Sequence, residues 1–406
     1  GYDAGTAITS GDYNTAVGSY ALDANTTGTE NTALGVNALG GNTTASYNTA
    51  VGMQALVTNT TGTYNSAFGW GALNSNTTAD GNTAIGNLTL YNNSTGSNDT
   101  AVGYNALNDN TTGAQNTAVG ALALDANTTG GQNTALGDGA LGANTTASNN
   151  TAIGSNALLL NTTGHSNVAM GHDAAEGHTT GEHNTIIGFE ASKSANTGNN
   201  NTSVGTAAGY SNSAGDNNTN YGRASGYQIS TGNENVCIGR HAGFDVTSGD
   251  QNVCIGPQAG RGQVTTTDGD LYIARSNTAA GNALTWIAGN SSGTCYQGDN
   301  TTSWSTVSDR RLKKNITNNT KGLAEIDQLR VANFEYKAEA EIDMSEFPLA
   351  DGPNQVVIGK GNEGVHTGVI AQEIEAVLPE CIKISDKGAK TVNTDPIMWA
   401  LVNAVK

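Results

Sequence analysis

Nearly half of this sequence, from its start, has no Lys or Arg. Lys and Arg are absent from the first 192 residues, and 12 of the 17 in the chain lie from Arg310 onward. The formal net charge is −18. Phosphate binding needs clusters of Lys and Arg, so this distribution argues against nucleic acid as a partner. It also separates a nearly uncharged region, rich in Gly, Asn, Thr and Ala, from a tail of ordinary mixed composition.

Long apolar runs and cysteines are scarce as well. No stretch has the length of a transmembrane helix, so we expect no membrane insertion. Four cysteines are too few for a disulfide-stabilised fold. Cys237 and Cys254 occupy the same place in adjacent repeats. We predict that each is a small buried hydrophobic residue standing in for Ala, rather than half of a disulfide.

What the sequence does contain is one repeated motif, "NTAVG" at residues 14–18. Near-copies begin every 17 residues from Asn14 to Asn252, fifteen in all, without an insertion. Counted from that Asn as position 1, position 4 is bulky and mostly aliphatic (Val17) and position 5 is always Gly (Gly18). A short period without insertions is typical of a solenoid, in which each unit stacks only on its neighbours.

Seventeen residues suit one coil of two short strands and two turns. Alternation along the strand predicts that Thr15 and Val17 fill the coil interior and that the small third residue, Ala16, points outward. Gly18 then permits a turn, and the "NTT" segments (25–27) supply another, in which Asn tolerates unusual backbone angles. Stacked Asn residues are expected to form side-chain ladders. At about 4.8 Å per coil, fifteen coils give a rod of roughly 70 Å.

So thin a coil buries too little apolar surface to offset its ordering entropy. We therefore predict a homo-oligomer that packs through the small outward Ala face. Residues 1–265 resemble the left-handed parallel β-roll heads of trimeric autotransporter adhesins, although the period is longer than the usual adhesin repeat. The resemblance implies a left-handed, homotrimeric solenoid shaft or head. Later repeats read Ala-Gly (208–209) where early ones read Ala-Leu (21–22), which predicts a thinner coil or a changed interface.

Two local patterns within the repeats have competing interpretations. The Asn-X-Thr triplets recur with the structural period, which favours turn chemistry over glycosylation. Four histidines, His165, His172, His178 and His183, lie within two coils, but no HxH or HxxxH pair occurs among them. We predict surface loops here, with no metal site and no cofactor anywhere in the chain.

The period stops near residue 265, and the tail divides in two. Residues 266–307 read as a β-rich connector, with strands expected at 270–274 and 282–289. Residues 308–406 have the composition of an α+β domain. The final segment, "TDPIMWALVNAVK", predicts a helix with Thr394 or Asp395 as N-cap and Pro396 in the first turn. The predicted class is therefore mainly β: a solenoid, a connector and an α+β domain.

The segment "SDRRLKKNI" (308–316) has two interpretations from its residues alone. Ser308 can cap a helix, with Asp309 beside the helix dipole and a solvated basic face after it, and composition favours this. Alternatively, a neutral Lys313 takes the proton of the Ser308 hydroxyl. On one helix these two side chains would point about 140° apart, so a dyad needs a turn between them or a Lys from a neighbouring protomer.

Three motifs in order, "SDRRLKKNI", "FEYK" (334–337) and "TGVIAQEIEAVLPE" (367–380), resemble the self-cleaving intramolecular chaperone domain of phage tail fibres and tailspikes. The resemblance implies a domain that trimerises the fibre, aids its folding and then cuts itself off. It implies Ser308 as nucleophile, Lys313 as its base in preference to Lys314, and Asp309 as a supporting residue. The scissile bond would be Val307–Ser308. Gln372 and Glu373 match an element of structural or regulatory role.

The sequence therefore predicts a homotrimeric attachment fibre of a virion tail or a related injection particle. Its partners would be a host-surface glycan or protein and other tail or baseplate proteins. Its enzymatic activity would be limited to single-turnover Ser–Lys autoproteolysis. The alternatives are a bacterial cell-surface trimeric adhesin, a solenoid polysaccharide lyase and an ice-binding solenoid. The neutral repeat speaks against a lyase cleft, and the Thr residues of "NTT" keep the ice-binding alternative open.

Overall fold

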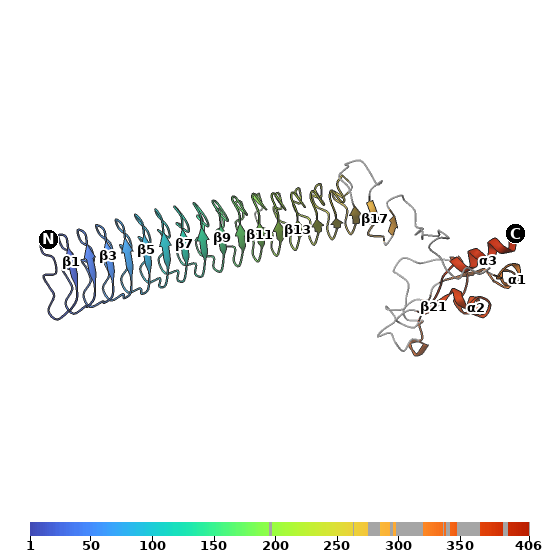
Figure 1. Cartoon of the computed structure of the whole chain (residues 1–406), viewed down its shortest axis with the longest axis horizontal. Coiled ribbons are helices and arrows are strands. Elements are labelled where there is room, and N and C mark those ends of the chain that lie inside the picture. Colours follow the sequence, from blue (N-terminus) through green and yellow to red (C-terminus); the bar gives the residue numbers. More distant parts are fainter. Residues whose placement is uncertain are drawn as a thin grey trace, which may run out of the picture. The chain divides into compact units, whose positions relative to one another are not determined.

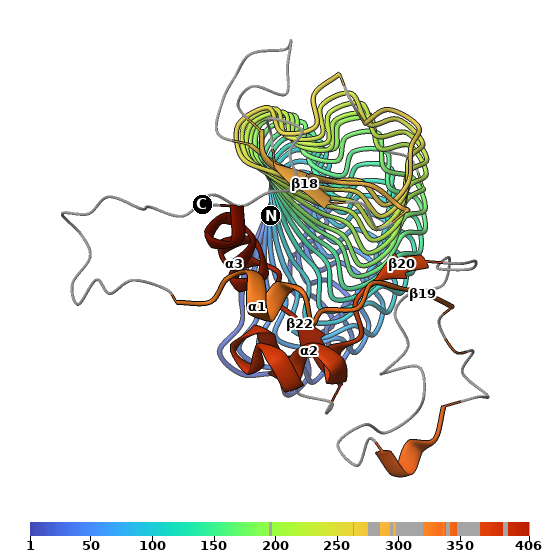
Figure 2. The same ribbon diagram turned by 90° about the vertical axis from the view of Figure 1, so that its right-hand side faces the viewer.

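In the computed structural model of the chain, the residues form two compact units, Gly1–Ser305 and Thr306–Lys406. The structure describes residues 1–194, 197–262, 264–274, 285–292, 295–297, 320–335, 337, 342–346, 366–384 and 389–405. The first unit is a rod of stacked coils (Figure 1). Seen end-on, successive coils rotate gradually along the stack (Figure 2).

Each coil of the rod contributes one three-residue strand, at positions 2–4 of the repeat. Thr15 pairs with Thr32 and Val17 with Leu34, in parallel and one period apart. The same register holds through the fifteen strands: β1 (Thr15–Val17), β2 (Thr32–Leu34), β3 (Thr49–Val51), β4 (Ser66–Phe68), β5 (Thr83–Ile85), β6 (Thr100–Val102), β7 (Thr117–Val119), β8 (Thr134–Leu136), β9 (Thr151–Ile153), β10 (Val168–Met170), β11 (Thr185–Ile187), β12 (Thr202–Val204), β13 (Thr219–Tyr221), β14 (Val236–Ile238) and β15 (Val253–Ile255). The parallel 17-residue β-solenoid is confirmed.

The predicted second strand of each coil is wrong. Positions 7 and 9 have positive φ, 58° at Tyr20 and 55° at Leu22, which takes the chain out of the β region after the Gly turn. Backbone hydrogen bonds between coils continue there, as from the Leu22 N–H to the Ala38 carbonyl at 3.0 Å. They belong to stacked turns rather than to a second sheet.

The interior of the coil is the reverse of the predicted one. Ala33 at position 3 is fully buried, whereas Leu34 at position 4 is 47% exposed. The inner space is already taken by Leu39 at position 9 and by Asn side chains, all fully buried, so only a methyl group fits at position 3. The strand therefore turns its aliphatic residue outward, and the prediction that Thr15 and Val17 fill the interior is wrong.

Two ladders of buried Asn run along the rod, as the sequence predicts. At position 12, the Asn42 amide donates to Asn25 Oδ1 at 2.9 Å and to the Ala45 carbonyl at 3.0 Å. At position 1, Asn14 Oδ1 accepts the Asn31 N–H at 2.9 Å. Asn25 is fully buried and does not have positive φ, so its role is hydrogen bonding rather than unusual backbone geometry. Its buried amide is also closed to glycosylation in the folded chain.

The core changes its composition in the last coils of the rod. At position 9, Leu gives way to glycines with positive φ, such as Gly243 at 56°. The vacated space is filled from position 3 by Cys237 and from position 12 by Val246, both fully buried. A methyl group on Gly243 would lie 2.2 Å from Cys237 Sγ. The Ala-Gly repeats therefore mark a repacked interior.

Beyond the fifteenth coil the sheet becomes antiparallel. β16 (Leu271–Ala274) still pairs in parallel with β15, but β17 (Thr285–Gly289) and β18 (Cys295–Gln297) add in antiparallel fashion. β16 and β17 fall within the segments predicted as strands at 270–274 and 282–289, whereas β18 lies where no strand was predicted. The two antiparallel strands, β17 and β18, do not belong to the repeat, and they cover the described end of the solenoid sheet.

The second unit is a small α+β domain. Its elements are α1 (Leu323–Ile326), β19 (Ala332–Phe334), η4 (Met344–Glu346), β20 (His366–Gly368), α2 (Ala371–Val377), η6 (Pro379–Cys381), β21 (Ile382–Ile384), β22 (Lys390–Val392) and α3 (Asp395–Val405). β19 pairs with β20 and β21 with β22, both antiparallel. Ile374, Leu378 and Cys381 form its buried core. The predicted C-terminal helix is α3, preceded by Thr394, whose carbonyl accepts the Met398 N–H at 3.0 Å.

Candidate functional site

The outward surface of the strands is the largest functional feature of the rod. From position 17 to position 4, exposed and buried residues alternate: Glu30 is exposed, Asn31 buried, Thr32 half-buried, Ala33 buried and Leu34 exposed. We call positions 2 and 4 of all coils the strand face. Position 17 forms its entry margin and position 6, just past the Gly turn, forms its exit margin.

Position 4 makes the strand face apolar along the whole rod. Val17 is 52% exposed, Leu136 46% and Ile238 39%. Other exposed position-4 residues are Leu34, Phe68, Ile85, Met170, Tyr221 and Ile255. A continuous apolar stripe across fifteen coils is far larger than scattered surface hydrophobics, and such patches mark interaction surfaces. The sequence-predicted Val17 therefore belongs to this face and not to the core.

The remaining repeat residues have structural places. Asn14 accepts the next coil's N–H, as described above. Gly18 has φ of 137°, and a Cβ there would lie 2.3 Å from the Gly35 carbonyl oxygen. Cys237 and Cys254 are buried and unbonded to each other, and contact with Cys254 together with burial raises the pKa of the Cys237 thiol. The Cys237 thiol is therefore a poor nucleophile.

The histidines do not all lie on the surface, so that prediction is wrong for His178. This residue occupies position 12, where other coils have Asn, and its ring is buried 2.9 Å from the Asn184 amide nitrogen. Burial disfavours the charged ring and lowers its pKa to about 4. His165, His172 and His183 are not buried. Within the described part of the chain, no group of three His, Cys, Asp or Glu residues could hold a metal.

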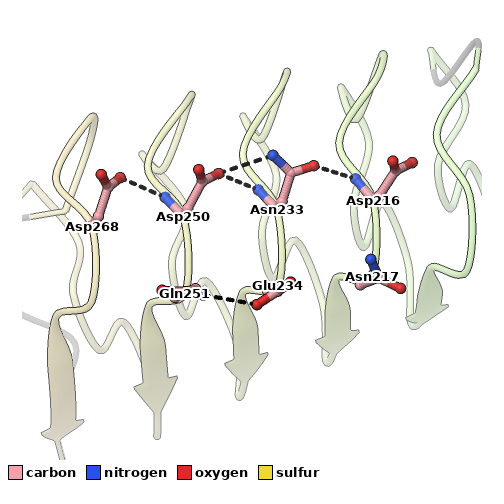
Figure 3. Close-up of a pocket in the computed structure, with 7 residues that line it drawn as sticks. All are labelled: Asp216, Asn217, Asn233, Glu234, Asp250, Gln251 and Asp268. Carbon is pink, nitrogen blue, oxygen red and sulfur yellow. Dashed lines mark hydrogen bonds between the residues drawn. The ribbon is translucent and has the colours of Figure 1, made fainter.

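A shallow polar groove runs beside the last coils (Figure 3). Its carboxylates act as caps for the neighbouring coil: Asp250 accepts the Asn233 N–H at 2.7 Å, and Asp216 accepts the Asn199 N–H at 2.7 Å. On the entry margin below them, Gln251 donates to Glu234 at 2.9 Å. The acidic side chains are thus engaged in stacking, and their arrangement does not form a catalytic carboxylate pair.

In the second unit, Gln372 and Glu373 lie on α2. Glu373 forms a two-pronged ion pair with Arg330, through Nη2 and through Nε at 3.1 Å. This hydrogen bonding lowers the pKa of Glu373. The pair joins α2 to the segment before β19 across 43 residues. Both side chains are exposed, so the pair contributes little to stability and acts mainly to orient α2. Sequence reasoning missed Arg330, because nothing local marks a partner so distant.

Helix α3 presents a second apolar surface. Met398 and Trp399 are each 62% exposed and Val405 is 84% exposed, while Ala400 is fully buried. An amphipathic helix normally buries its apolar stripe. The apolar side chains left outside the domain core form an exposed apolar patch of the kind that marks interaction surfaces.

The predicted cleavage site lies outside the described residues. This holds for Val307, Ser308, Asp309 and Lys313, so their roles stay predictions. Among the described residues, no helix is long and apolar enough to cross a membrane.

The comparisons with known proteins agree with this layout. Residues 308–383 match the model of the family described as chaperone of endosialidase. Neither the curated proteins nor the solved structures gave a match. A chaperone-of-endosialidase domain after a β-solenoid fits a tail fibre with a C-terminal chaperone domain.

Proposed function

We propose that this protein is a homotrimeric tail fibre for host attachment, assembled by its C-terminal chaperone domain. The carrying observation is the family match, which begins at Ser308 and follows a solenoid with an apolar strand face. In this proposal residues 1–265 are the shaft or head, 266–307 the connector and 308–406 the chaperone. Its setting is a virion tail, and its partners are a host-surface receptor and other tail or baseplate proteins.

The trimer is proposed to form through the strand face rather than through the Ala face. The position-3 Ala residues are buried within each coil and cannot reach another chain, whereas the position-4 stripe is exposed along the rod. A partner for this stripe must match its rise of about 4.8 Å per coil over fifteen coils. A copy of the same chain meets that requirement, and burying the stripe supplies apolar area that a single thin coil lacks.

The chaperone is proposed to leave by autoproteolysis. Lys313 takes the proton of the Ser308 hydroxyl, whose oxygen attacks the Val307 carbonyl carbon, and returns it to the Ser308 nitrogen as the Val307–Ser308 peptide bond breaks. Water then hydrolyses the resulting ester and releases the Val307 carboxylate. Fixing register before removal matters, because the Thr and aliphatic rows of the strand face do little by themselves to distinguish one coil from the next. After removal the rod cannot readily refold, so its stability becomes kinetic.

The test is the intact mass of the wild-type protein beside Ser308→Ala under denaturing conditions. We expect a wild-type break between Val307 and Ser308 that is abolished in the variant, because the nucleophile is gone. Lys314→Ala is the control and should cleave as the wild type does. An uncut wild type would leave the tail as a trimerisation module and would remove the Ser–Lys assignment.

A further inference from the structure

The two margins of the strand face have matching chemistry in two stretches of the rod. Tyr47 on the entry margin and Met53 on the exit margin flank the same strand, β3, and Tyr64 and Trp70 flank β4. All four are large, apolar or aromatic, and 39–63% exposed. Near the other end of the rod the margins are charged, with Glu234 on the entry side and two arginines on the exit side. Other coils pair unlike residues, such as Tyr13 with Ser19, Glu30 with Val36 and Asn98 with Tyr104.

The charged stretch of the exit margin forms no ion pair with the described residues of its own chain. Arg223 and Arg240 are exposed at position 6 of adjacent coils, and neither forms an ion pair with another described residue. Lys193, in contrast, is paired with Asp173 at 2.7 Å. Burial, and then the charges of the nearby arginines, lower the pKa of His241, as expected of an unneutralised positive surface.

A ring of three copies brings these margins together. If three strand faces turn toward a common axis, the entry margin of each copy lies beside the exit margin of the next, because the contact is head-to-tail. Glu234 and Arg240 bound the same strand, β14, and therefore meet at nearly the same height. This step rests on the trimer of the proposed function.

We propose that the entry margin of one copy packs against the exit margin of its neighbour in the same coil, and that the non-repeating pairs fix the register of the trimer. We call these register-fixing pairs the marks: the Glu234–Arg240 ion pair toward one end of the rod and the Tyr64–Trp70 contact toward the other. They supply the sequence-specific information that the uniform Thr and aliphatic rows of the strand face lack.

A closed ring makes these marks effective against slippage. When one copy slides by one coil, its contact with one neighbour shifts up while its contact with the other shifts down. A shift in one direction is tolerated, because Glu234 of one copy then faces Arg223 of its neighbour. The other places Glu234 opposite Pro257 and Tyr64 opposite Asn87, so the charge pair and the aromatic contact are both lost. No single-copy slip avoids this penalty.

Disulfide trapping in the full chain tests the pairing directly. Asn200→Cys with Thr206→Cys places thiols on the two margins of one coil without touching the marks. The strand β12 and the Gly205 turn lie between them, so within a chain they are at opposite edges of the strand face, too far apart for an intrachain disulfide. We expect oxidation to give covalent dimers and trimers on a non-reducing denaturing gel. The offset pair Asn200→Cys with Arg223→Cys, and each single variant, should give little or no trimer.

A charge swap tests the register mark itself. Glu234→Arg and Arg240→Glu should each lower the melting temperature of the trimer by several degrees, and the double variant should recover most of that loss. Light scattering gives the oligomeric state of every variant. A monomeric wild type would overturn the trimer and with it the proposed function. A wild-type trimer without cross-links, or a swap no better than the single variants, would overturn only the margin pairing.

An external anion is the competing occupant of the arginines, and sulfated dextran serves as its probe. If Arg240→Glu abolishes retention on sulfated dextran but leaves trimer stability unchanged, the exit margin binds an outside polyanion and the pairing is overturned. Under our proposal the assembled wild-type trimer is retained no better than the charge-swap variant.

Discussion

Replacing Gly137 by Ala is expected to destabilise the rod by at least about 3 kcal/mol per chain. Gly137 has φ of 143°, a region that L-residues rarely adopt, and the strain alone is of order 1–3 kcal/mol. The added methyl carbon would also lie 2.4 Å from the Gly154 carbonyl oxygen on the next coil. That oxygen belongs to rigid stacked backbone, so the coils must separate there and lose hydrogen bonds.

The measurement is thermal unfolding followed by circular dichroism, with Gly40→Ala as the matched control. Both variants change Gly to Ala and therefore affect the unfolded chain equally. A Cβ on Gly40 would be no nearer than 3.3 Å to the surrounding atoms, and neighbouring coils carry Asp23 and Val57 at the same position. We expect Gly40→Ala to melt close to wild type. Equal melting of the two variants would contradict the close-stacked turn.

The solenoid followed from the sequence because its period is exceptionally regular. Which side chains point inward did not follow from the sequence, since alternation along a strand allows either set of side chains to face the coil interior. The deciding feature was Leu39 at position 9, which fills the interior despite φ of 50°. Nothing local predicts a Leu in the left-handed region. Its full burial in a stacked core stabilises a backbone that propensity disfavours. The small size of Ala at position 3 already indicated that little space is available inside the coil.

The candidate sites were predictable only where a motif carried them. The segment around Ser308 was recognised from residue order, and the family match over 308–383 supports that recognition. By contrast, Arg330 reaches Glu373 from 43 residues away, a contact set by tertiary packing alone. His178 was misplaced for a related reason. A buried ladder position that accepts Asn can also accept a neutral imidazole, because both provide hydrogen-bonding nitrogen.

Asp99 is the carboxyl that breaks the Asn ladder at position 1. Its side chain is fully buried, and Oδ1 accepts the Asn116 N–H at 2.8 Å, as an Asn would. Burial raises its pKa from 3.8 to about 7, against the opposing effect of the Asn116 hydrogen bonds. A protonated carboxyl retains a donor where Asn has its amide nitrogen, whereas the ionised form has none and places a charge inside the rod.

The sign of the pH effect follows from proton uptake. Between pH 4 and 7 the folded chain holds a proton on Asp99 that the unfolded chain has released. Stability is therefore highest below the unfolded pKa, falls as pH rises through this window and is constant above it. A shift of this size corresponds to about 4 kcal/mol per chain. Other carboxyls also titrate in the acid range, so the contribution of Asp99 must be isolated by substitution.

Asp99→Asn restores the ladder residue and removes the titrating group. We expect the variant and wild type to be about equally stable near pH 4, and the variant to be more stable by a few kcal/mol at pH 8, in denaturant unfolding at matched ionic strength. Asp80→Asn removes an equal charge from an exposed position and serves as control, with a profile parallel to wild type. A constant difference between Asp99→Asn and wild type from pH 4 to 8 would show that Asp99 stays ionised in the fold. The ladder would then hold a buried charge, and proton uptake would play no part in the rod's stability.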